Sequence, residues 1–309
     1  MKLMVLASRF PYPLEKGDKL RLFHQIRMLS KKHQIKLVAL SHVPVSEASL
    51  DELRPFCESI HVFPLTNVGS AKALFTTSFG KKPWQSGLYY RKKIHDEIRL
   101  LAKDWQPDRV YSQLMRMALY GEGLSFPVTL DFMDAYSVGM ARRASKSKWP
   151  LTWLFQEESR RLLRFERESL KAFDDCTIIS KPDADAIGDG IRIVPNGVDL
   201  DYFSPASDHE AQYDVVFVGN MSYFPNVRAA NILAKKVLTG LPEGSTILLA
   251  GADPKPSVKA LENNQVHLTG WIDDIREAYN NGKVFAAPLF TGSGQQNKLL
   301  EAMALGRPC

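Results

Sequence analysis

A chain of 309 residues is too long for one small hydrophobic core, and at roughly 100 to 200 residues per domain it predicts two domains. Its 45% hydrophobic and 24% charged residues are typical of a soluble globular protein and exclude disordered and collagen-like classes. The formal charge is a modest +6, no apolar run reaches the roughly 18 residues that cross a bilayer, and the 3 cysteines form no Cys-x-x-Cys pair, so we expect a cytoplasmic protein without a structural zinc site.

Apolar runs alternate with helical patterns along the first half, which predicts an α/β fold whose parallel sheet is built from βαβ units. The expected strands lie near residues 3–7, 35–40, 60–63, 109–111, 128–130, 177–179 and 191–195. The first expected helix has Leu20 and Phe23 on successive turns, with Asp18 as its N-cap. A long amphipathic helix is expected over residues 151–173.

The second half repeats this architecture after a polar stretch, residues 200–212, that predicts a linker. Its expected strands lie near 215–219, 247–250, 266–269 and 284–287, and its helices near 226–238, 257–263, 275–280 and 297–305. We therefore expect an N-terminal domain over 1–190, an interdomain strand and linker over 191–212, and a C-terminal domain over 213–309. Because the last residues should lead into another strand, we expect this C-terminal domain to be truncated.

Two segments mix basic residues with aromatic and apolar ones. Residues 81–116 hold nine Lys and Arg against four acids, and residues 142–171 show the same counts. Trp84 and Tyr89 interleave with the first set, Trp149 and Trp153 with the second. Such mixtures suit the anionic surface of a membrane or an anionic lipid-linked acceptor, and a solvated helix face is the alternative. We expect no nucleic-acid partner.

The segment from Thr291 to Pro308 joins a glycine-bracketed turn to an apolar helix. Glycine lets backbone N–H groups approach an anion, and the following helix N-terminus adds about half a positive charge, which suits a phosphate. Lys298 and Glu301 are three residues apart and share a helix face, so they offer a cation for a phosphate and a carboxylate for hydroxyl groups. This pattern predicts a nucleotide-sugar site; an ordinary loop before a buried helix is the alternative.

The loop after the first strand carries Gly17, Asp18 and Lys19 at an expected helix start. Ligands of open α/β sheets gather at such turns, where Gly17 could offer an N–H group and Lys16, Lys19 and Arg21 positive charge. No G-x-G-x-x-G is present, which counts against a nicotinamide dinucleotide. A glycine used only for turn geometry is the alternative.

Asp134 follows the expected strand at 128–130, where cleft residues belong. It is a candidate polar contact to a sugar or acceptor, with an N-cap of the next helix as the alternative. Asp183 and Asp185 form an Asp-x-Asp pair away from the other motifs, and we do not interpret this pair as a metal site.

Five segments occur in order and carry a resemblance over nearly the whole chain: residues 13–24, 131–137, 196–199, 219–226 and 291–308. Together they resemble glycosyltransferase family 4, and in particular the sugar transferases associated with bacterial exopolysaccharide and PEP-CTERM systems. The QNK-x-x-EAMA segment is the most specific part. The resemblance implies a GT-B fold, in which two Rossmann-like domains with parallel sheets face a cleft, the first binding the acceptor and the second the nucleotide sugar.

The resemblance also implies roles for individual residues. It places Gly17, Asp18 and Lys19 near the acceptor and the donor diphosphate, and Asp134 and Lys298 in catalysis. On the donor side it assigns Gly219, Asn220, Ser293, Gly294, Lys298 and Glu301, with Glu301 on the ribose. Three positions depart from the family: Asn220 and Asn226 where cations are common, and Ser293 where an acid is. Lys298 is then the main diphosphate partner, with Arg228 or the segment 16–21 as possible aids.

The implied activity is that of a retaining glycosyltransferase of hexosyltransferase type. It would move a sugar from a nucleotide diphosphate sugar to a lipid-linked or polysaccharide acceptor in exopolysaccharide biosynthesis, without a metal or other cofactor. We expect a cytoplasmic protein, peripheral at the inner face of the cell membrane. Two alternatives stay open: a nucleotide-sugar epimerase of the same fold, and a non-catalytic binding component. Whether the truncated chain is active is open too.

Overall fold

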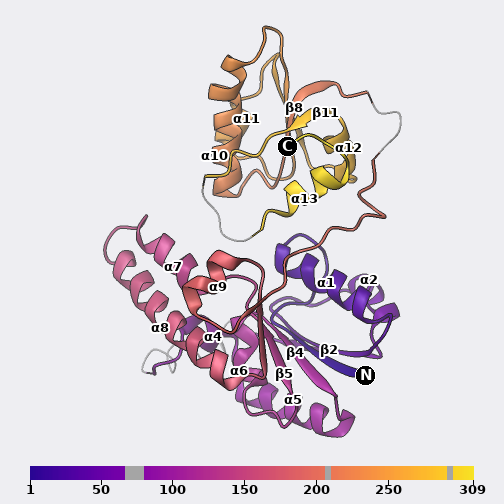
Figure 1. Ribbon diagram of the computed structural model, residues 1–309, viewed down its shortest axis with the longest axis vertical. Helices are drawn as coiled ribbons and strands as arrows, with labels where there is room; N and C mark the ends of the chain where they lie inside the picture. Colours follow the sequence, from indigo (N-terminus) through magenta and orange to yellow (C-terminus); the bar gives the residue numbers. More distant parts are fainter. Residues whose placement is uncertain (67–79, 206–209, 291–294) are drawn as a thin grey trace. The chain divides into compact units, whose positions relative to one another are not determined.

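The computed structural model describes residues 1–66, 80–205, 210–290 and 295–309. The chain divides into two compact units, residues 1–195 and 196–309 (Figure 1). Among the described residues, no helix is both long enough and apolar enough to cross a membrane.

Unit 1 contains a parallel sheet of seven strands in the order β3-β2-β1-β4-β5-β6-β7. Its strands are β1 (Lys2–Ala7), β2 (Gln34–Ser41), β3 (Ser59–Pro64), β4 (Arg109–Gln113), β5 (Val128–Asp131), β6 (Asp175–Ile178) and β7 (Arg192–Ile193). Its helices are α1 (Gly17–Leu29), α2 (Glu47–Asp51), α4 (Trp84–Tyr89), α5 (Lys92–Trp105), α6 (Ala118–Gly121), α7 (Tyr136–Ala144), α8 (Leu151–Ala172) and α9 (Lys181–Ile187). The predicted alternation of strands and helices is confirmed.

Helices cover both faces of this sheet. Alternate residues of a strand point to opposite faces, so one strand packs against helices on both sides. On β1, Val5 packs in one hydrophobic cluster with Leu22 of α1, while Leu6 packs in another with Ile98 of α5. Burial on both faces explains why β1 is a continuous apolar run rather than an alternating one.

The expected N-cap at Asp18 is wrong, and so is the alternative interpretation of Asp134 as an N-cap. Helix α1 begins at Gly17 with Lys16 in the N-cap position, and Asp18 lies inside the first turn, where its carboxylate pairs with Arg9. In the same way Ala135, and not Asp134, precedes α7. Asp18 still lies where the helix dipole favours an anion, but its partner is a side chain and not a backbone N–H group.

Unit 2 contains a parallel sheet of four strands in the order β10-β9-β8-β11. The strands are β8 (Tyr213–Val218), β9 (Ile247–Ala250), β10 (Val266–Gly270) and β11 (Gly282–Phe285). The helices are α10 (Phe224–Ile232), continued by a π turn (Leu233–Val237) and a 3₁₀ turn (Leu238–Gly240), then α11 (Pro256–Lys259), α12 (Ile275–Asn280) and α13 (Asn297–Ala304). The helix expected over 257–263 is thus a single turn, and the other three are confirmed in place.

Candidate functional site

In unit 2, Lys298 from α13 reaches the carboxyl end of β8. Its Nζ donates to Oδ1 of Asn226 at 2.9 Å and lies 4.7 Å from the centre of the Phe217 ring. The Asn226 amide is itself oriented, because its Nδ2 donates to the backbone oxygen of Asn220 at 2.9 Å. The amide therefore fixes the lysine in place while leaving its charge uncompensated.

Gly219, directly after β8, is the residue that allows this approach. A Cβ atom there would lie 2.7 Å from Nδ2 of Asn226 and 2.8 Å from Nζ of Lys298, both far too close. The next strand ends in a similar way, since a Cβ on Gly251 would lie 2.2 Å from the backbone oxygen of Gly219. Two glycines therefore bring backbone and a cation together at this edge, as phosphate sites require.

The charge on Lys298 is held in a largely buried position. Burial lowers the pKa of Lys298 to about 8, and the nearby Glu301 opposes that shift. Among the described residues no carboxylate lies within ion-pair distance of Lys298. A partly desolvated cation without an ion-pair partner attracts an anion more strongly than a solvated one does.

Glu301 lies one turn further along α13. Its Oε2 accepts a hydrogen bond of 2.7 Å from the hydroxyl of Tyr279 in α12. Burial raises the pKa of Glu301, while that hydrogen bond and Lys298 act in the opposite direction. Leu299 packs against the hydrophobic core of the unit, whereas Met303 is exposed. Tyr279 was not anticipated, because a lone aromatic residue in a helix gives no sign of its partner.

The start of α13 is tied to the segment at residues 196–199. The backbone N–H of Asn196 donates to Oε1 of Gln295 at 2.7 Å, and its side-chain Nδ2 donates to Oδ1 of Asn297 at 2.8 Å. These bonds join two of the motifs that carried the resemblance. Ser293 and Gly294, which were assigned to the donor site, lie outside the described residues.

The remaining donor-side candidates are engaged locally. Asn220 accepts hydrogen bonds at Oδ1 from the N–H and hydroxyl of Ser222, and its Nδ2 donates to Asp253 at 3.1 Å. Asn220 therefore shapes the loop after Gly219. Arg228, the suggested aid to Lys298, is exposed and has its guanidinium 6.0 Å from the Phe290 ring.

Arg21 does not supply free charge to a ligand, which corrects one expectation. It is buried, its Nε lies 3.0 Å from Oδ2 of Asp131, and it donates to the backbone oxygens of Val194 and Pro195. Tyr111 donates a further hydrogen bond of 2.6 Å to the same carboxylate oxygen. Arg21 and Asp131 thus join α1, β5 and the backbone after β7 in the interior of unit 1.

Asp134 lies beyond the carboxyl end of β5, in unit 1. The Met133 backbone before it is left-handed (φ 61°), as is that of Leu114 after the adjacent β4 (φ 70°). Such conformations are unfavourable for residues other than glycine and cluster at functional sites. Burial raises the pKa of Asp134 to about 6, with Asp183 and Asp131 adding to the shift. No described residue donates a hydrogen bond to this carboxylate.

Gly17, Asp18 and Lys19 form the first turn of α1, at the same edge of the sheet. Asp18 pairs with Arg9 at 2.9 Å, Lys19 donates to the backbone oxygen of Tyr12 at 3.4 Å, and Gly17 has open space around its Cα. Nε2 of Gln113 donates to the backbone oxygen of Asp18 at 3.0 Å and to Sδ of Met133, the residue before Asp134, at 3.4 Å. This side chain therefore joins the first turn of α1 to the segment that carries Asp134, within unit 1.

The Asp-x-Asp pair is used locally. Asp183 is buried and accepts from the hydroxyl of Ser180, while Asp185 pairs with Lys181 on the surface. Within the described ranges, no group of three or more His, Cys, Asp or Glu side chains could hold a metal ion.

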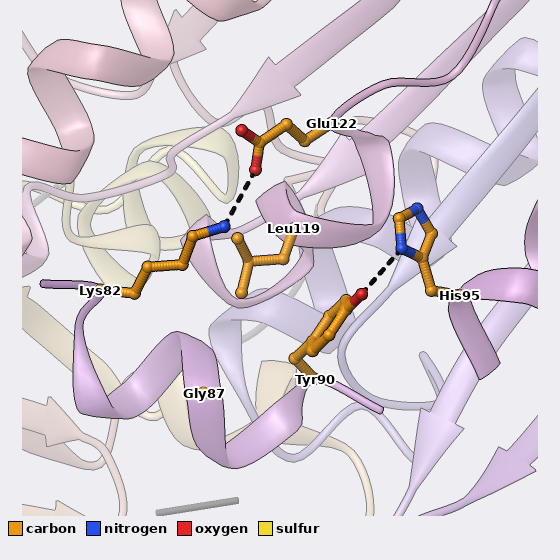
Figure 2. Close-up of a pocket in the computed structure, with 6 residues that line it drawn as sticks. All are labelled: Lys82, Gly87, Tyr90, His95, Leu119 and Glu122. Atoms are coloured by element: carbon orange, nitrogen blue, oxygen red, sulfur yellow. Dashed lines mark hydrogen bonds and ion pairs between the residues drawn. The ribbon is translucent and has the colours of Figure 1, made fainter. Parts of the chain in front are cut away.

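One described pocket in unit 1, about 340 Å³ in volume, lies away from these residues. Figure 2 shows that its walls carry an ion pair between Lys82 and Glu122, 3.3 Å apart, and a hydrogen bond of 3.0 Å between the Tyr90 hydroxyl and Nδ1 of His95. None of the predicted site residues lines it.

Comparison with known proteins agrees with this arrangement. Residues 212–309 match the family model of glycosyl transferases group 1. A Klebsiella pneumoniae protein described as an uncharacterized 44.6 kDa protein in the cps region is 22% identical over 98% of this chain and 80% of its own length. The similarity to this relative therefore covers nearly the whole chain and is not confined to residues 212–309.

Solved structures share the fold of both units. Anabaena HepE in complex with UDP and glucose superposes with a TM-score of 0.66 at 14% identity, over 100% of this chain and 79% of its own. WaaG, a glycosyltransferase involved in lipopolysaccharide biosynthesis, gives 0.59 at 17% identity, over 100% and 80%. The chain therefore has the GT-B fold, and its residues 212–309 match the glycosyl transferases group 1 family.

Proposed function

We propose that this chain is a glycosyltransferase whose unit 2 binds a nucleoside diphosphate sugar. The observation that carries the proposal is the position of Lys298, a largely buried cation held by the neutral amide of Asn226 above Gly219. The family match over residues 212–309 supports it, as does the fold shared with Anabaena HepE, which was crystallised with UDP and glucose.

In this proposal the diphosphate lies at the carboxyl edge of β8. Departure of the nucleoside diphosphate from the sugar places negative charge on the leaving phosphate, and a fixed cation there lowers the barrier. Lys298 supplies that cation, and Glu301 accepts hydrogen bonds from the ribose hydroxyls while Tyr279 orients it. Because Asn226 is neutral and forms no ion pair with the lysine, Lys298 can take the role that a metal ion would have at the diphosphate.

We further propose that Asp134 contacts the sugar or the acceptor from unit 1. Its carboxylate has no described donor and lies beyond a strand end, as a substrate-contacting group would. Retention of configuration, transfer of a hexose, and a lipid-linked or polysaccharide acceptor belong to this proposal. The cps-region relative supports a role in exopolysaccharide biosynthesis.

The proposal includes contact with the inner face of the cell membrane. Trp149, Leu151, Trp153 and Leu154, here called the Trp149 patch, are exposed where α8 begins. Trp149 is 84% exposed, and Arg142, Arg143, Lys146 and Lys148 before it are exposed too. Indole rings and cations of this kind favour an anionic bilayer surface. Trp84 of the other basic segment lies instead beneath the guanidinium of Arg161, 4.8 Å away.

The test is turnover of nucleotide sugars by the full chain. We expect hydrolysis of one donor in a panel of nucleoside diphosphate sugars, and transfer when a lipid-linked or polysaccharide acceptor is added. Conversion of the donor sugar into an epimer without acceptor would favour the epimerase. Donor binding without any turnover would favour a non-catalytic component.

A further inference from the structure

Arg116 in unit 1 is a stacked cation for which the described residues provide no hydrogen-bond partner. It lies in the 3₁₀ turn Met115–Met117 after β4, and its guanidinium carbon is 4.8 Å from the ring centre of Tyr89 and 5.4 Å from that of Tyr136. Its Nε is buried and finds no acceptor among the described residues, and none of their carboxylates pairs with it. A buried charged N–H group without an acceptor lowers the stability of the fold unless a ligand accepts its hydrogen bond.

Two other arginines of the same unit have hydrogen-bond acceptors for their guanidinium groups. Arg21 has a carboxylate and backbone oxygens as partners. Arg161 also stacks on an aromatic ring, Trp84, but its Nε is bound by Glu157 at 2.9 Å and its Nη1 by the backbone oxygen of Gly80 at 2.8 Å. Stacking alone therefore does not explain Arg116, because its buried Nε has no hydrogen-bond acceptor among the described residues.

The charges near Arg116 are positive on the side of Tyr89. His42 contacts the Tyr89 ring edge to face at 5.5 Å, and its pKa is lowered by burial and by the charges of Arg9, Arg91 and Arg116. The charges that act on Tyr136 are mixed, since Asp18 and Asp134 act there against Arg116 and Arg9, and Asp18 is itself paired with Arg9 at 2.9 Å. An anion is therefore favoured on the Tyr89 side of Arg116 rather than on the Tyr136 side.

We propose that Arg116 binds a phosphate group of the acceptor, with Tyr89 and Tyr136 holding the guanidinium plane and His42 flanking the anion. A guanidinium held by its faces presents its N–H edge, which matches two phosphate oxygens. Sheet order places the residues in a row, since β2, β1, β4 and β5 are neighbours and are followed by His42, Arg9, Arg116 and Asp134. The assignment of this phosphate to the acceptor rests on the proposed function, whereas the phosphate site itself does not.

The experiment is a titration of the full chain with inorganic phosphate, followed by ³¹P NMR. It is done in the Lys298→Met background, so that the predicted donor site does not bind the probe. We expect phosphate binding to persist in Lys298→Met and to weaken about tenfold or more when Arg116→Met is added. Arg99→Met, at an exposed arginine of α5, is the matched control and should change nothing.

His42→Ala provides a second variant, because His42 is exposed and its loss should weaken phosphate binding a few-fold without unfolding the chain. Equal phosphate binding by the Arg116 and Arg99 variants would overturn the inference. So would complete loss of binding in Lys298→Met alone, an outcome that leaves the proposed function standing. Acetate that binds as tightly as phosphate would overturn the assignment to phosphate. Failure of donor turnover with Arg116-dependent phosphate binding intact would overturn the proposed function only.

Discussion

Nζ of Lys298 donates a hydrogen bond of 2.9 Å to Oδ1 of Asn226, over the Cα of Gly219. The partner is a neutral amide, so the lysine is oriented without losing its net charge. Asn226 stands near a position where the resembling family commonly has a cation. The site thus has one cation, Lys298, oriented by an amide, in agreement with the expectation that Lys298 is the main diphosphate partner.

Gly219→Ala should weaken UDP binding by about tenfold while leaving the fold intact. The added Cβ meets the ends of two side chains, Asn226 and Lys298, which can move aside at small cost to stability but then lose their hydrogen bond. Calorimetric titration with UDP and a thermal unfolding scan measure the two effects. Gly240→Ala, with no atom near the added Cβ, is the control. UDP affinity equal to that of the wild type would show that the Lys298 position does not matter.

Asp134→Asn should stabilise unit 1 while abolishing sugar transfer. The pKa of Asp134 is raised from 3.8 to about 6 in the folded chain, so ionisation costs stability once the pH exceeds these values. The cost is absent below about pH 4, grows as the pH rises to about 6 and is complete above it. At 1.36 kcal/mol per pKa unit, partly screened, it is about 1 to 3 kcal/mol.

Urea unfolding of wild type and Asp134→Asn across this pH range measures that gap in free energy of unfolding. Asp96→Asn, at an exposed carboxylate of α5, controls for the loss of one negative charge and should show no such pH dependence. A gap that shrinks with rising pH would mean that Asp134 is stabilised as an anion.

Glu301→Gln should weaken binding of UDP by about 5-fold to 30-fold and leave binding of inorganic pyrophosphate unchanged. The reason is that the carboxylate is expected to contact the ribose, and exchanging a charged acceptor for the neutral amide of glutamine weakens such a hydrogen bond by about 1 to 2 kcal/mol. Tyr279 can still donate to the amide oxygen of glutamine, so the local structure should persist. Glu277→Gln in α12, at an exposed position, is the matched control. Equal losses for both ligands would place Glu301 near the phosphates instead.

Replacing both Trp149 and Trp153 by alanine should abolish binding of the chain to vesicles that contain anionic lipid. The variant lacks the apolar contact of two exposed indole rings with the bilayer, and each contact contributes about 1.5 to 3 kcal/mol of binding free energy. Cosedimentation with vesicles measures the effect, and added salt should weaken wild-type binding by screening Lys146 and Lys148. Trp271→Ala removes an equally accessible tryptophan from unit 2 and should bind as the wild type does.

Much of the fold could be predicted because its strands are buried on both faces. Val5 and Leu6 pack on opposite sides of the sheet, so β1 reads as a continuous apolar run, and β9 does so for the same reason. The ends of helices were harder to predict where a side-chain hydrogen bond, and not the apolar pattern, determines where the helix stops. The helix α11 stops after one turn, and Oδ1 of Asn263 then accepts from the N–H groups of Gln265 and Val266 and turns the chain.

The candidate sites were harder to predict because their partners are far apart in the sequence. Arg21 and Asp131 are separated by 110 residues, and nothing in the local pattern distinguishes a buried arginine from a ligand-binding one. Lys298 and Glu301 could be named because three residues separate them on one helix. Asn226, Tyr279 and Arg116 act through tertiary contacts that only the folded chain shows.

The most direct test of the donor site is calorimetric titration of UDP into the wild type and Lys298→Met, with Lys259→Met as the control at an exposed lysine of the same unit. The wild type and Lys259→Met should bind UDP alike, and Lys298→Met should bind it about 10-fold to 100-fold more weakly, as expected for loss of a hydrogen-bonded charge. Wild-type binding should also weaken as the pH rises through about 8, where Lys298 loses its proton. Equal UDP affinity in all three proteins would contradict the assignment of unit 2 as the nucleotide-sugar site.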